Sequence, residues 1–375
     1  MRVLVLGGTG AMGEPLVRML AERGDEVYVT SRRKREDKGN VHYIQGDAHD
    51  LSFIKQELNK NYDAIVDFMI YSTDDFRDRS KIYLQSTGQY MFLNSARVYA
   101  ESKEAITENS ARLLDVCKDE EYLKTDEYAL AKARSENVLF ESEYKNWTII
   151  RPYITYNTRR LQLSGLELGT WLTAVLSGRP LVLPKDVGMH QTTMTHGDDV
   201  AQAMAALIGN NKSFGEAFHI TGNDYMKWRE VAEVYKNVLE EDTGHTVEIY
   251  EPEASKKLSV IMGNATQIKY DRTYDRVFDN SKLLTTCGYG VRFISMTEGL
   301  NRCLYDYLSL PDKQKLVNHN IMYEAWLDKS TGRAATFDGV ESAKGKLKYM
   351  GYYHAPGVIQ MLKKIKHMIR QNHVI

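Results

Sequence analysis

Short apolar runs alternate with amphipathic stretches along most of the chain. Runs typical of buried strands cover residues 2–6, 26–30, 41–45, 64–70, 90–93, 148–150 and 218–220. Between them, apolar side chains recur at helical spacing in stretches such as 51–58, 126–140 and 199–208. Strands that alternate with helices in this way predict an α/β fold built on a doubly wound parallel sheet.

Composition narrows the classes of protein that this pattern admits. Of the 375 residues, 43% are hydrophobic and 26% are charged, which argues for a soluble globular protein and against a disordered one. The net charge of −1 gives no overall positive field to hold nucleic acid or an anionic membrane. No apolar run approaches the ~20 residues of a membrane span, and glycines interrupt the apolar N-terminus before a signal-peptide pattern develops.

The cysteines and histidines show no pattern of a disulfide framework or a metal site. Cys117, Cys287 and Cys303 lie far apart in the sequence, so we expect a reducing, cytoplasmic environment. His190 and His196 are six residues apart, which is not a ligand spacing on one helix. The sequence therefore predicts no metal.

A glycine-rich segment joins the first strand to the helix that follows it. Its residues are Gly7, Gly8, Thr9, Gly10, Ala11, Met12 and Gly13. Gly7 permits a tight turn, Gly10 lets the backbone approach a diphosphate, and Gly13 lets the helix pack on the strand. The helix N-terminus adds free N–H groups and the positive end of its dipole. We predict a dinucleotide-binding loop in which Thr9, Ala11 and Met12 take part; a glycine turn without a ligand is the alternative.

The end of the second strand bears on the choice of dinucleotide. An acidic residue at this place would bind the ribose 2′-hydroxyl of NAD. Here Ser31 is followed by Arg32, and a hydroxyl with a guanidinium suits a 2′-phosphate. These residues favour NADP(H) over NAD(H). For the neighbouring Lys34 and Arg35, a solvated basic turn is the better explanation.

A tyrosine and a lysine lie one turn apart in the predicted helix 126–140. Tyr128 and Lys132 are four residues apart and therefore point the same way. A phenol is a poor acid or base at pH 7, and a neighbouring ammonium favours its phenolate. Ser95 follows the fifth strand, at the sheet edge where parallel sheets place their ligands. A catalytic site is predicted by the order of three features: the glycine loop, the serine at the strand end and the Tyr/Lys pair. The pair alone would be weak evidence, because such pairs are common on exposed helices.

Six segments together match the motifs of a known family. They read GGTGAMG at 7–13, NSARVY at 94–99, YALAK at 128–132, RPYITY at 151–156, THGDDVA at 195–201 and FDNSK at 278–282. Over roughly residues 1–305 the chain resembles the extended short-chain dehydrogenase/reductases, the NAD-dependent epimerase/dehydratase family. Members of this family act mostly on nucleotide sugars.

The resemblance implies a role for each candidate residue. Tyr128 would be the acid/base, Lys132 would lower the pKa of Tyr128 and bind the nicotinamide ribose, and Ser95 would polarise the substrate. The cofactor would lie with its diphosphate on Gly7, Gly10 and Gly13, its adenine beside Asp47 and its nicotinamide beside Pro152.

The chain departs from the family pattern at three places. The 4,6-dehydratases carry an Asp-Glu pair where this chain has Ala96 and Arg97, so we expect no dehydration. Segment 72–88 has only 17 residues, fewer than the usual loop and long helix, so substrate recognition and the usual homodimer are both open. This short segment resembles an offshoot that includes plant chloroplast stem-loop RNA-binding proteins. Asn94 stands where another small hydroxyl residue is usual.

We expect three regions along the chain. A dinucleotide-binding domain covers 1–152 with 192–222 returning to it, a smaller substrate-binding lobe covers 153–191 and 223–310, and residues 311–375 form a basic extension. Arg272 and Arg276 are expected on one helical or loop face of the lobe and are candidates to clamp a substrate diphosphate, with ordinary surface arginines as the alternative. Arg97 is a third candidate for substrate binding.

The charge of the extension differs from that of the rest of the chain. Residues 311–375 hold 11 Lys+Arg and 5 Asp+Glu, a net charge of +6, whereas residues 1–310 carry −7. Apolar side chains recur at helical spacing at Val358, Met361, Leu362, Ile365, Met368 and Ile369, with Lys363, Lys364, Lys366 and Arg370 largely opposite. Such a helix can bind a membrane surface or a partner. Docking on the acidic body of its own chain or of a second subunit is the favoured interpretation.

Three functions fit these observations. The first is an NAD(P)-dependent epimerase or reductase of a nucleotide-linked sugar. The second is a cofactor-binding regulatory or RNA-binding protein, suggested by segment 72–88 and the basic extension. The third is a reductase of a small non-sugar carbonyl compound. Ser95, Tyr128 and Lys132 together favour an enzyme.

Overall fold

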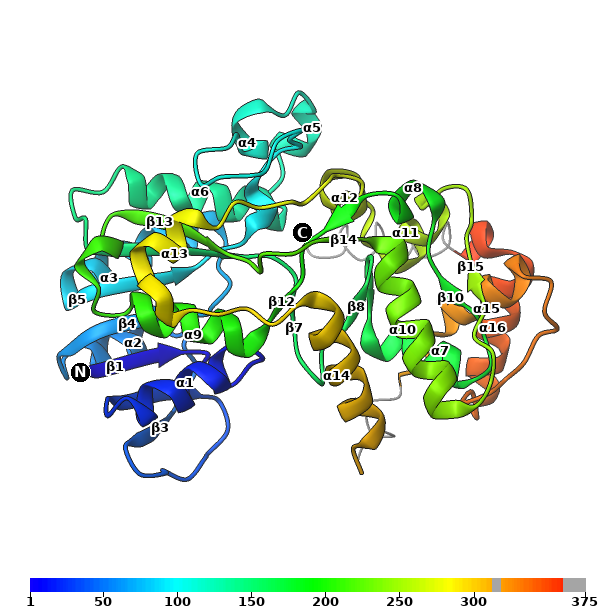
Figure 1. Cartoon of the computed structure of the whole chain (residues 1–375), viewed down its shortest axis with the longest axis horizontal. Helices are drawn as coiled ribbons and strands as arrows, with labels where there is room; N and C mark the ends of the chain where they lie inside the picture. Colours follow the sequence, from blue (N-terminus) through cyan, green and yellow to red (C-terminus); the bar gives the residue numbers. More distant parts are fainter. Residues whose placement is uncertain (312–317, 360–375) are drawn as a thin grey trace, which may run out of the picture. The chain divides into compact units, whose positions relative to one another are not determined.

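The computed structural model describes residues 1–311 and 318–359, which divide into two compact units (Figure 1). The larger unit comprises Met1–Arg159, Gln191–Met226 and Tyr274–Leu300. The smaller unit comprises Arg160–His190, Lys227–Thr273 and the described part of Asn301–Ile375.

Two boundaries differ from the predicted ones. Residues 274–300, expected in the substrate lobe, belong to the larger unit. They do so because Phe278 packs on Tyr99 and Tyr153, and Leu283 joins the core beneath the sheet. The described part of the extension, 318–359, belongs to the smaller unit and does not form a separate region.

The larger unit is built on a seven-stranded parallel sheet with the order β13-β6-β5-β4-β1-β2-β3. Its strands are β1 (Arg2–Leu6), β2 (Glu26–Ser31), β3 (Val41–Gln45), β4 (Tyr62–Asp67), β5 (Thr87–Leu93), β6 (Trp147–Pro152) and β13 (Glu216–Ile220). The chain runs outward from β1 in both directions, which confirms the predicted doubly wound sheet.

Alternate side chains of β1 face two separate cores. Val3 and Val5 face the core covered by α1 (Gly13–Glu22) and α9 (Gly197–Leu207), which lie side by side in Figure 1. Leu4 and Leu6 face the opposite core, covered by α2, α3 and α6. These helices span Leu51–Leu58, Thr73–Ser86 and Tyr128–Phe140. Because both faces are buried, the strands appear in the sequence as nearly continuous apolar runs.

The fourth strand is shorter than its apolar run predicts. β4 ends at Asp67, whereas the run continues to Ile70. The Asp67 carboxylate accepts a hydrogen bond from the backbone N–H of Met69 at 2.9 Å, and this turn takes the chain out of the sheet. Ile70 is consequently 63% exposed.

The short segment between β4 and β5 folds almost entirely as a helix. The hydroxyl of Ser72 accepts a hydrogen bond from the backbone N–H of Asp75 at 3.2 Å and so begins α3. α3 then leads directly into β5 at Thr87 and packs on α6. α3 takes up 14 residues of the segment, so that its connections to β4 and β5 are short.

Short elements complete the larger unit. They are a 3₁₀ turn at Ala96–Val98, α4 (Leu113–Val116), α5 (Glu120–Leu123), β7 (Thr155–Tyr156), β11 (Gln191–Thr192), β12 (Thr195–His196), a 3₁₀ turn at Asn211–Ser213, β14 (Met226–Lys227, at a unit boundary), α13 (Ser281–Cys287) and a 3₁₀ turn at Gly288–Gly290. α14 (Met296–Ser309) begins in the larger unit and ends in the smaller one.

The smaller unit is mainly helical. Its elements are β8 (Gln162–Leu163), β9 (Leu166–Glu167), α7 (Leu168–Leu176), β10 (Leu181–Val182), α8 (Lys185–Gly188), α10 (Trp228–Thr243), β15 (Ile249–Tyr250), α11 (Lys256–Met262), α12 (Ala265–Gln267), a π-helical turn (Ile268–Arg272), α15 (Ile321–Ser330) and α16 (Ala343–His354). Tyr235 of α10 stacks on Trp171 of α7 with the ring centroids 4.8 Å apart. The apolar face of α10 therefore packs into a core.

The described part of the extension docks on the smaller unit through a buried ion pair. Nη2 of Arg179 lies 2.9 Å from Oδ2 of Asp328 in α15, and both side chains are almost fully buried. The hydroxyl of Tyr349 in α16 also donates to Asp328. This observation supports docking on the same chain for 318–359, whereas the predicted basic helix lies outside the described residues from 360 onward. Within 1–311 and 318–359, no helix combines the length and apolarity needed to cross a membrane.

Candidate active site

The glycines of the loop after β1 meet different steric conditions. A Cβ at Gly13 would lie 2.6–2.7 Å from the backbone of Gly8, which lets the start of α1 pack against the loop. A Cβ at Gly10 would meet open space, so the backbone there can be approached by a ligand. Gly7 has a φ of +73° and donates its N–H to the hydroxyl of Thr30 at 3.1 Å.

The start of α1 suits an anionic ligand. Its N-cap residue is Met12, whose side chain has no oxygen to occupy the first backbone N–H groups of the helix. Open space at Gly10 and this helix N-terminus fit the diphosphate of a dinucleotide. Gly8 is a residue that the sequence interpretation did not assign, although its close contact with Gly13 is what the loop requires.

The residues predicted to read the adenosine end are engaged in local turns. The hydroxyl of Ser31 donates to the carbonyl of Arg33 at 2.8 Å and accepts from the N–H of Arg33 at 3.3 Å. Arg32 is exposed. Asp47 accepts a hydrogen bond from the N–H of His49 at 3.0 Å. The preference for NADP(H) stays a prediction.

Ser95 stands at the carboxyl end of β5, as the sequence predicts for a strand-end residue. It is the N-cap of the 3₁₀ turn Ala96–Val98, and its hydroxyl accepts a hydrogen bond from the N–H of Arg97 at 3.2 Å. The preceding Asn94 is buried and donates to the carbonyl of Lys132 at 3.3 Å and to Glu136. Asn94 therefore joins the end of β5 to α6, which gives a physical reason for an amide at this position.

Tyr128 and Lys132 project from the first turns of α6. The helix begins at Tyr128 and not at residue 126, because the carboxylate of Glu127 accepts a hydrogen bond from the N–H of Ala129 at 2.9 Å. Nζ of Lys132 lies 5.9 Å from the centroid of the Tyr128 ring and donates to the carbonyl of Leu93 at 2.7 Å. The structure thus brings Lys132 to the carboxyl end of β5, the strand end that leads into Ser95.

The ammonium of Lys132 is in an unusual environment. The side chain is buried, and burial disfavours its charge, which lowers the pKa of Lys132 to about 8. The nearby carboxylates of Asp67 and Glu136 oppose this effect. A buried lysine with a lowered pKa at the edge of a parallel sheet is typical of a functional site.

A buried ion network behind α6 supports this arrangement. Nε of Arg151 lies 2.6 Å from Oε1 of Glu136, and Arg112 lies 3.1 Å from the other oxygen. Arg151 also donates to the hydroxyl of Tyr99 at 2.7 Å. Glu136 and Arg151 were not predicted as site residues. The spacing of Glu136, one helical turn after Lys132, was the available signal. Pro152, next to Arg151, ends β6 and is buried.

Arg97 lies against Tyr128. Its guanidinium carbon is 5.3 Å from the centroid of the Tyr128 ring, and Nη2 lies 2.8 Å from Oε1 of Glu127. Of the three arginines considered for substrate binding, Arg97 is the one that the described contacts bring to the Tyr/Lys pair.

Arg272 and Arg276 belong to different units and are each buried among other partners, which differs from the predicted shared element. Arg272 belongs to the smaller unit, where it is buried, pairs with Asp271 and donates to the carbonyl of Ser164 at 3.0 Å. Arg276 belongs to the larger unit, where it is fully buried and donates to the carbonyls of Tyr99 and Ala100 at 3.1 Å. A spacing of four residues places two side chains on one face only within a helix. The π-helical turn ends at Arg272, so Arg276 lies beyond it.

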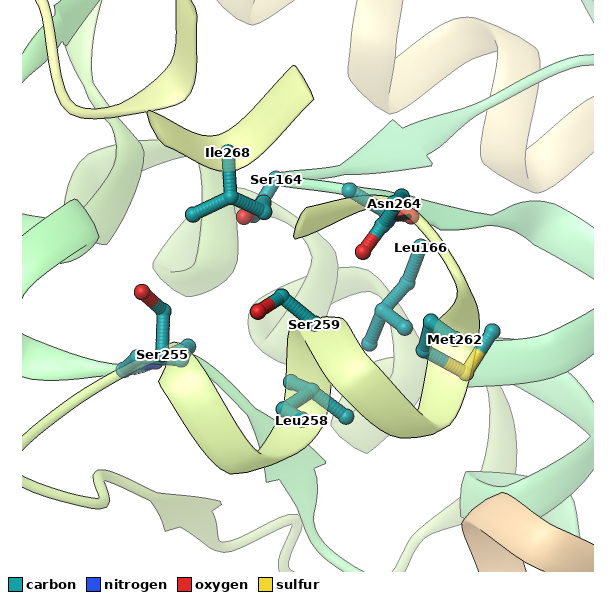
Figure 2. A pocket seen from close by; sticks show the side chains of 10 residues that line it. Ser164, Leu166, Ser255, Leu258, Ser259, Met262, Asn264 and Ile268 are labelled. Carbon is teal, nitrogen blue, oxygen red and sulfur yellow. Dashed lines mark hydrogen bonds between the residues drawn. The ribbon is translucent and has the colours of Figure 1, made fainter. Parts of the chain in front are cut away.

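A cavity in the smaller unit lies near Arg272 and is too small for a sugar (Figure 2). It measures about 10 Å³, which is room for about one water molecule. Its lining includes Ser164, Leu166, Ser255, Leu258, Ser259, Met262, Asn264 and Ile268. Across the described chain, no group of three His, Cys, Asp or Glu side chains is arranged to hold a metal ion.

Comparison with known proteins agrees with this arrangement of fold and site. The sequence model of the NAD dependent epimerase/dehydratase family matches residues 3–221, more than half of the chain. The protein therefore belongs to the NAD-dependent epimerase/dehydratase family.

Two curated relatives differ in what they do. A chloroplast stem-loop binding protein of 41 kDa from Arabidopsis thaliana is 26% identical over 242 residues, 60% of each chain. UDP-glucose 4-epimerase from Lacticaseibacillus casei is 26% identical over 155 residues, 39% of this chain and 46% of that one. The chain thus spans 60% or less of the length of these relatives.

Solved structures share the fold. UDP-glucuronic acid 4-epimerase from Bacillus cereus, in complex with UDP-glucuronic acid and NAD, has a TM-score of 0.61 at 17% identity and covers 82% of this chain and 99% of its own. dTDP-glucose 4,6-dehydratase from Bacillus anthracis, in complex with NAD, has a TM-score of 0.63 at 16% identity and covers 84% and 99%.

Proposed function

We propose that the protein is an NAD(P)-dependent epimerase or reductase of a nucleotide-linked sugar. One observation carries the proposal: α6 presents Tyr128 one turn from a buried Lys132, at the strand end that holds Ser95. Family membership and the nucleotide-sugar complexes of structural neighbours support the substrate class. A cytoplasmic location is part of this proposal.

In the proposed reaction Tyr128 exchanges a proton with a substrate oxygen. The positive charge of Lys132 favours the phenolate of Tyr128, which can then remove the proton of a substrate hydroxyl. The hydroxyl of Ser95 orients the same oxygen by a hydrogen bond. In the reducing direction Tyr128 returns the proton to that oxygen. The bound nicotinamide supplies hydride exchange at the carbon.

Dehydration is not part of the proposal. It requires a further acid and base beside the strand-end hydroxyl, and Ala96 and Arg97 occupy those positions. For the cofactor we propose NADP(H), since Arg32 is exposed at the end of β2 and the neighbouring Thr30 and Ser31 carry no negative charge. Mass spectrometry of cofactor released from the purified protein tests this choice, and NAD as the sole species would contradict it.

The role of Tyr128 is tested by Tyr128→Phe. We expect turnover of a confirmed substrate to fall by ~10²–10⁴-fold, the usual contribution of a positioned acid/base. Tyr144→Phe removes a phenol that bonds Gln85 elsewhere in the larger unit and serves as the matched control. Near-normal turnover of Tyr128→Phe would reject the proposed chemistry.

A second candidate function is binding of a nucleic-acid stem-loop. The Arabidopsis relative supports it through its name, and α16 exposes Lys344, Lys346 and Lys348. We expect an RNA hairpin to bind with an affinity that falls as salt rises, and substitution of the three lysines by glutamate to abolish binding. Failure of the hairpin to bind at low salt would reject this candidate. The third function, reduction of a small non-sugar carbonyl compound, is distinguished from sugar chemistry by assaying turnover of such compounds directly.

A further inference from the structure

Two cations that come from different elements lie near the ring of Tyr128. Lys132 belongs to the same helix, and its Nζ is 5.9 Å from the ring centroid. Arg97 belongs to the 3₁₀ turn after β5, and its guanidinium carbon is 5.3 Å from the same centroid. The proposed chemistry of the site uses Lys132 and leaves Arg97 without a role. Both distances are within the range at which a cation interacts with an aromatic ring, about 6 Å.

The guanidinium of Arg97 is held in place by a small network. Glu127 binds it at 2.8 Å, while the second oxygen of Glu127 accepts from the hydroxyl of Tyr122 at 3.0 Å and from the N–H of Ala129. The backbone N–H of Arg97 donates to Ser95. The side chains of Arg97 and Glu127 are 14% and 20% exposed, so solvent screens their charges only in part. This network fixes the cation beside the ring before any ligand binds.

We propose that Arg97 is a positioning residue that keeps a permanent positive charge beside the ring of Tyr128 and so favours the phenolate of Tyr128. The inference rests on the proposed acid/base role of Tyr128 and explains how that role is sustained. It is an electrostatic argument, since a guanidinium stays protonated throughout the working pH range of a protein whereas a buried ammonium does not.

The two cations respond differently to pH. Burial lowers the pKa of Lys132 to about 8, so its charge is lost over the mildly alkaline range. The charge of Arg97 persists there. A site with Lys132 alone would lose phenolate stabilisation as pH rises through 8, and Arg97 compensates for that loss.

Other charged groups face this pair and modulate it. Glu127 opposes Arg97 directly, and Asp67 and Glu136 act on Lys132 from β4 and from the next turn of α6. Arg276 is close enough to Arg97 for their charges to repel, and burial is the main cause that lowers the pKa of Arg276. Glu127 neutralises part of the effect of Arg97. Removal of the charge of Arg97 should therefore raise the pKa of Tyr128, whereas removal of the charge of Glu127 should lower it.

The test follows Tyr128 itself and needs no substrate. In protein labelled with 3-fluorotyrosine, the ¹⁹F resonance that disappears in Tyr128→Phe reports the ionisation of this one phenol among 24 tyrosines. We expect Arg97→Gln to raise the apparent pKa of Tyr128 by about one unit, the scale of a cation within several ångströms. Glu127→Gln should lower it, because Arg97 then acts unopposed. Arg97→Lys keeps the positive charge and should return the pKa of Tyr128 most of the way to its wild-type value.

A purely structural role for Arg97 gives a different result. Loss of packing would move the Tyr128 titration in the same direction in Arg97→Gln and Glu127→Gln, and that outcome would overturn the proposal. Arg77→Gln, an exposed arginine paired with Asp74 on α3, is the matched control and should leave the titration unchanged. If Arg97→Gln does not fold by circular dichroism, the titration of Arg97→Lys against wild type remains decisive, and an identical Tyr128 resonance in all folded variants rejects the inference.

Activity then separates this inference from the proposed function. With a confirmed substrate, Arg97→Gln should lose kcat selectively above pH 8, and Arg97→Lys should recover it. A raised KM with an unchanged kcat at every pH would instead identify Arg97 as a substrate-binding residue and overturn the proposal. If the ¹⁹F titration shifts as expected but no sugar substrate is turned over, the proposed function fails while the electrostatic role of Arg97 stands.

Discussion

Two of the buried cations, Arg179 in the smaller unit and Lys132 in the larger one, have opposite surroundings. In the smaller unit, burial disfavours the charge of Arg179, but the hydrogen bond to Asp328 together with the negative charges of Asp328 and Glu324 outweighs it, so that the pKa of Arg179 is raised. In the larger unit, Lys132 donates to a backbone carbonyl, and within residues 1–311 and 318–359 it forms no ion pair. Its pKa is lowered to about 8.

The presence or absence of a paired carboxylate is the difference expected between a buried cation that stabilises the fold and one that acts on other groups. A buried cation with a bound carboxylate is neutralised within the protein and joins two elements, here the α7–β10 connection and α15. A buried cation without one destabilises the fold and keeps its electrostatic effect for other groups. The comparison therefore supports the proposed catalytic role of Lys132 and a structural role for Arg179.

The largest change in stability is expected when the ion pair between Arg179 and Asp328 is broken. Arg179→Met leaves Asp328, fully buried, without its main partner, and should lower the free energy of unfolding by about 3–5 kcal/mol. Denaturant unfolding followed by tryptophan fluorescence measures the change. Arg333→Met is the control, since Arg333 is 42% exposed and 3.6 Å from Asp328. Equal losses in the two variants would contradict the distinction.

Removal of the Lys132 ammonium, which has no paired carboxylate among the described residues, should instead stabilise the fold. Lys132→Met should raise the free energy of unfolding at pH 7 by about 3 kcal/mol, while activity is lost. The sign follows from the lowered pKa in the folded state: the penalty is complete below pH 8 and disappears as pH rises toward the unfolded value near 10.5. Wild-type stability therefore rises with pH between these values.

The measurement is denaturant unfolding at intervals between pH 7 and about 10.5. In Lys132→Met the alkaline rise in stability should be missing. Lys55→Met changes an exposed lysine of α2 and should leave it intact. A Lys132→Met protein that is less stable than wild type at pH 7 would show that the ammonium is compensated after all.

The smallest effect concerns Asp67, which acts on Lys132 from the end of β4. Asp67→Asn removes an interaction that favours the protonated amine, so the alkaline rise in stability should begin about 0.5–1 pH unit lower. The amide oxygen can still accept from the N–H of Met69, which limits structural damage. Asp74→Asn, at an exposed position of α3, should not move the onset.

Local patterns predicted the parts of the fold that depend on local causes. β1, β3 and α2 were predicted to the residue, because the apolar runs of the two strands end before Gly7 and Gly46 and the amphipathic period of the helix ends before Asn59. β4 was overextended, since the chain leaves the sheet through a hydrogen bond to the side chain of Asp67 and not through a change of polarity.

The candidate site shows the same limit. Tyr128 and Lys132 could be paired from helical spacing alone. The neighbours of Asn94, and the separate surroundings of Arg272 and Arg276, depend on residues distant in sequence. Spacing says nothing of such contacts. Whether Ser31 and Arg32 select NADP(H) depends on a ligand and stays a prediction.

The ion pair between Arg179 and Asp328 also determines where the chain can be shortened. A protein that stops at residue 310 would lose α15 and α16, and Arg179 would be left in the interior without its carboxylate. Any loss of binding or activity in such a protein would then report a damaged smaller unit and would reveal nothing of the basic residues beyond it. A chain ended after His354 keeps the pair and Tyr349, and so separates the contribution of the last residues from the integrity of the fold.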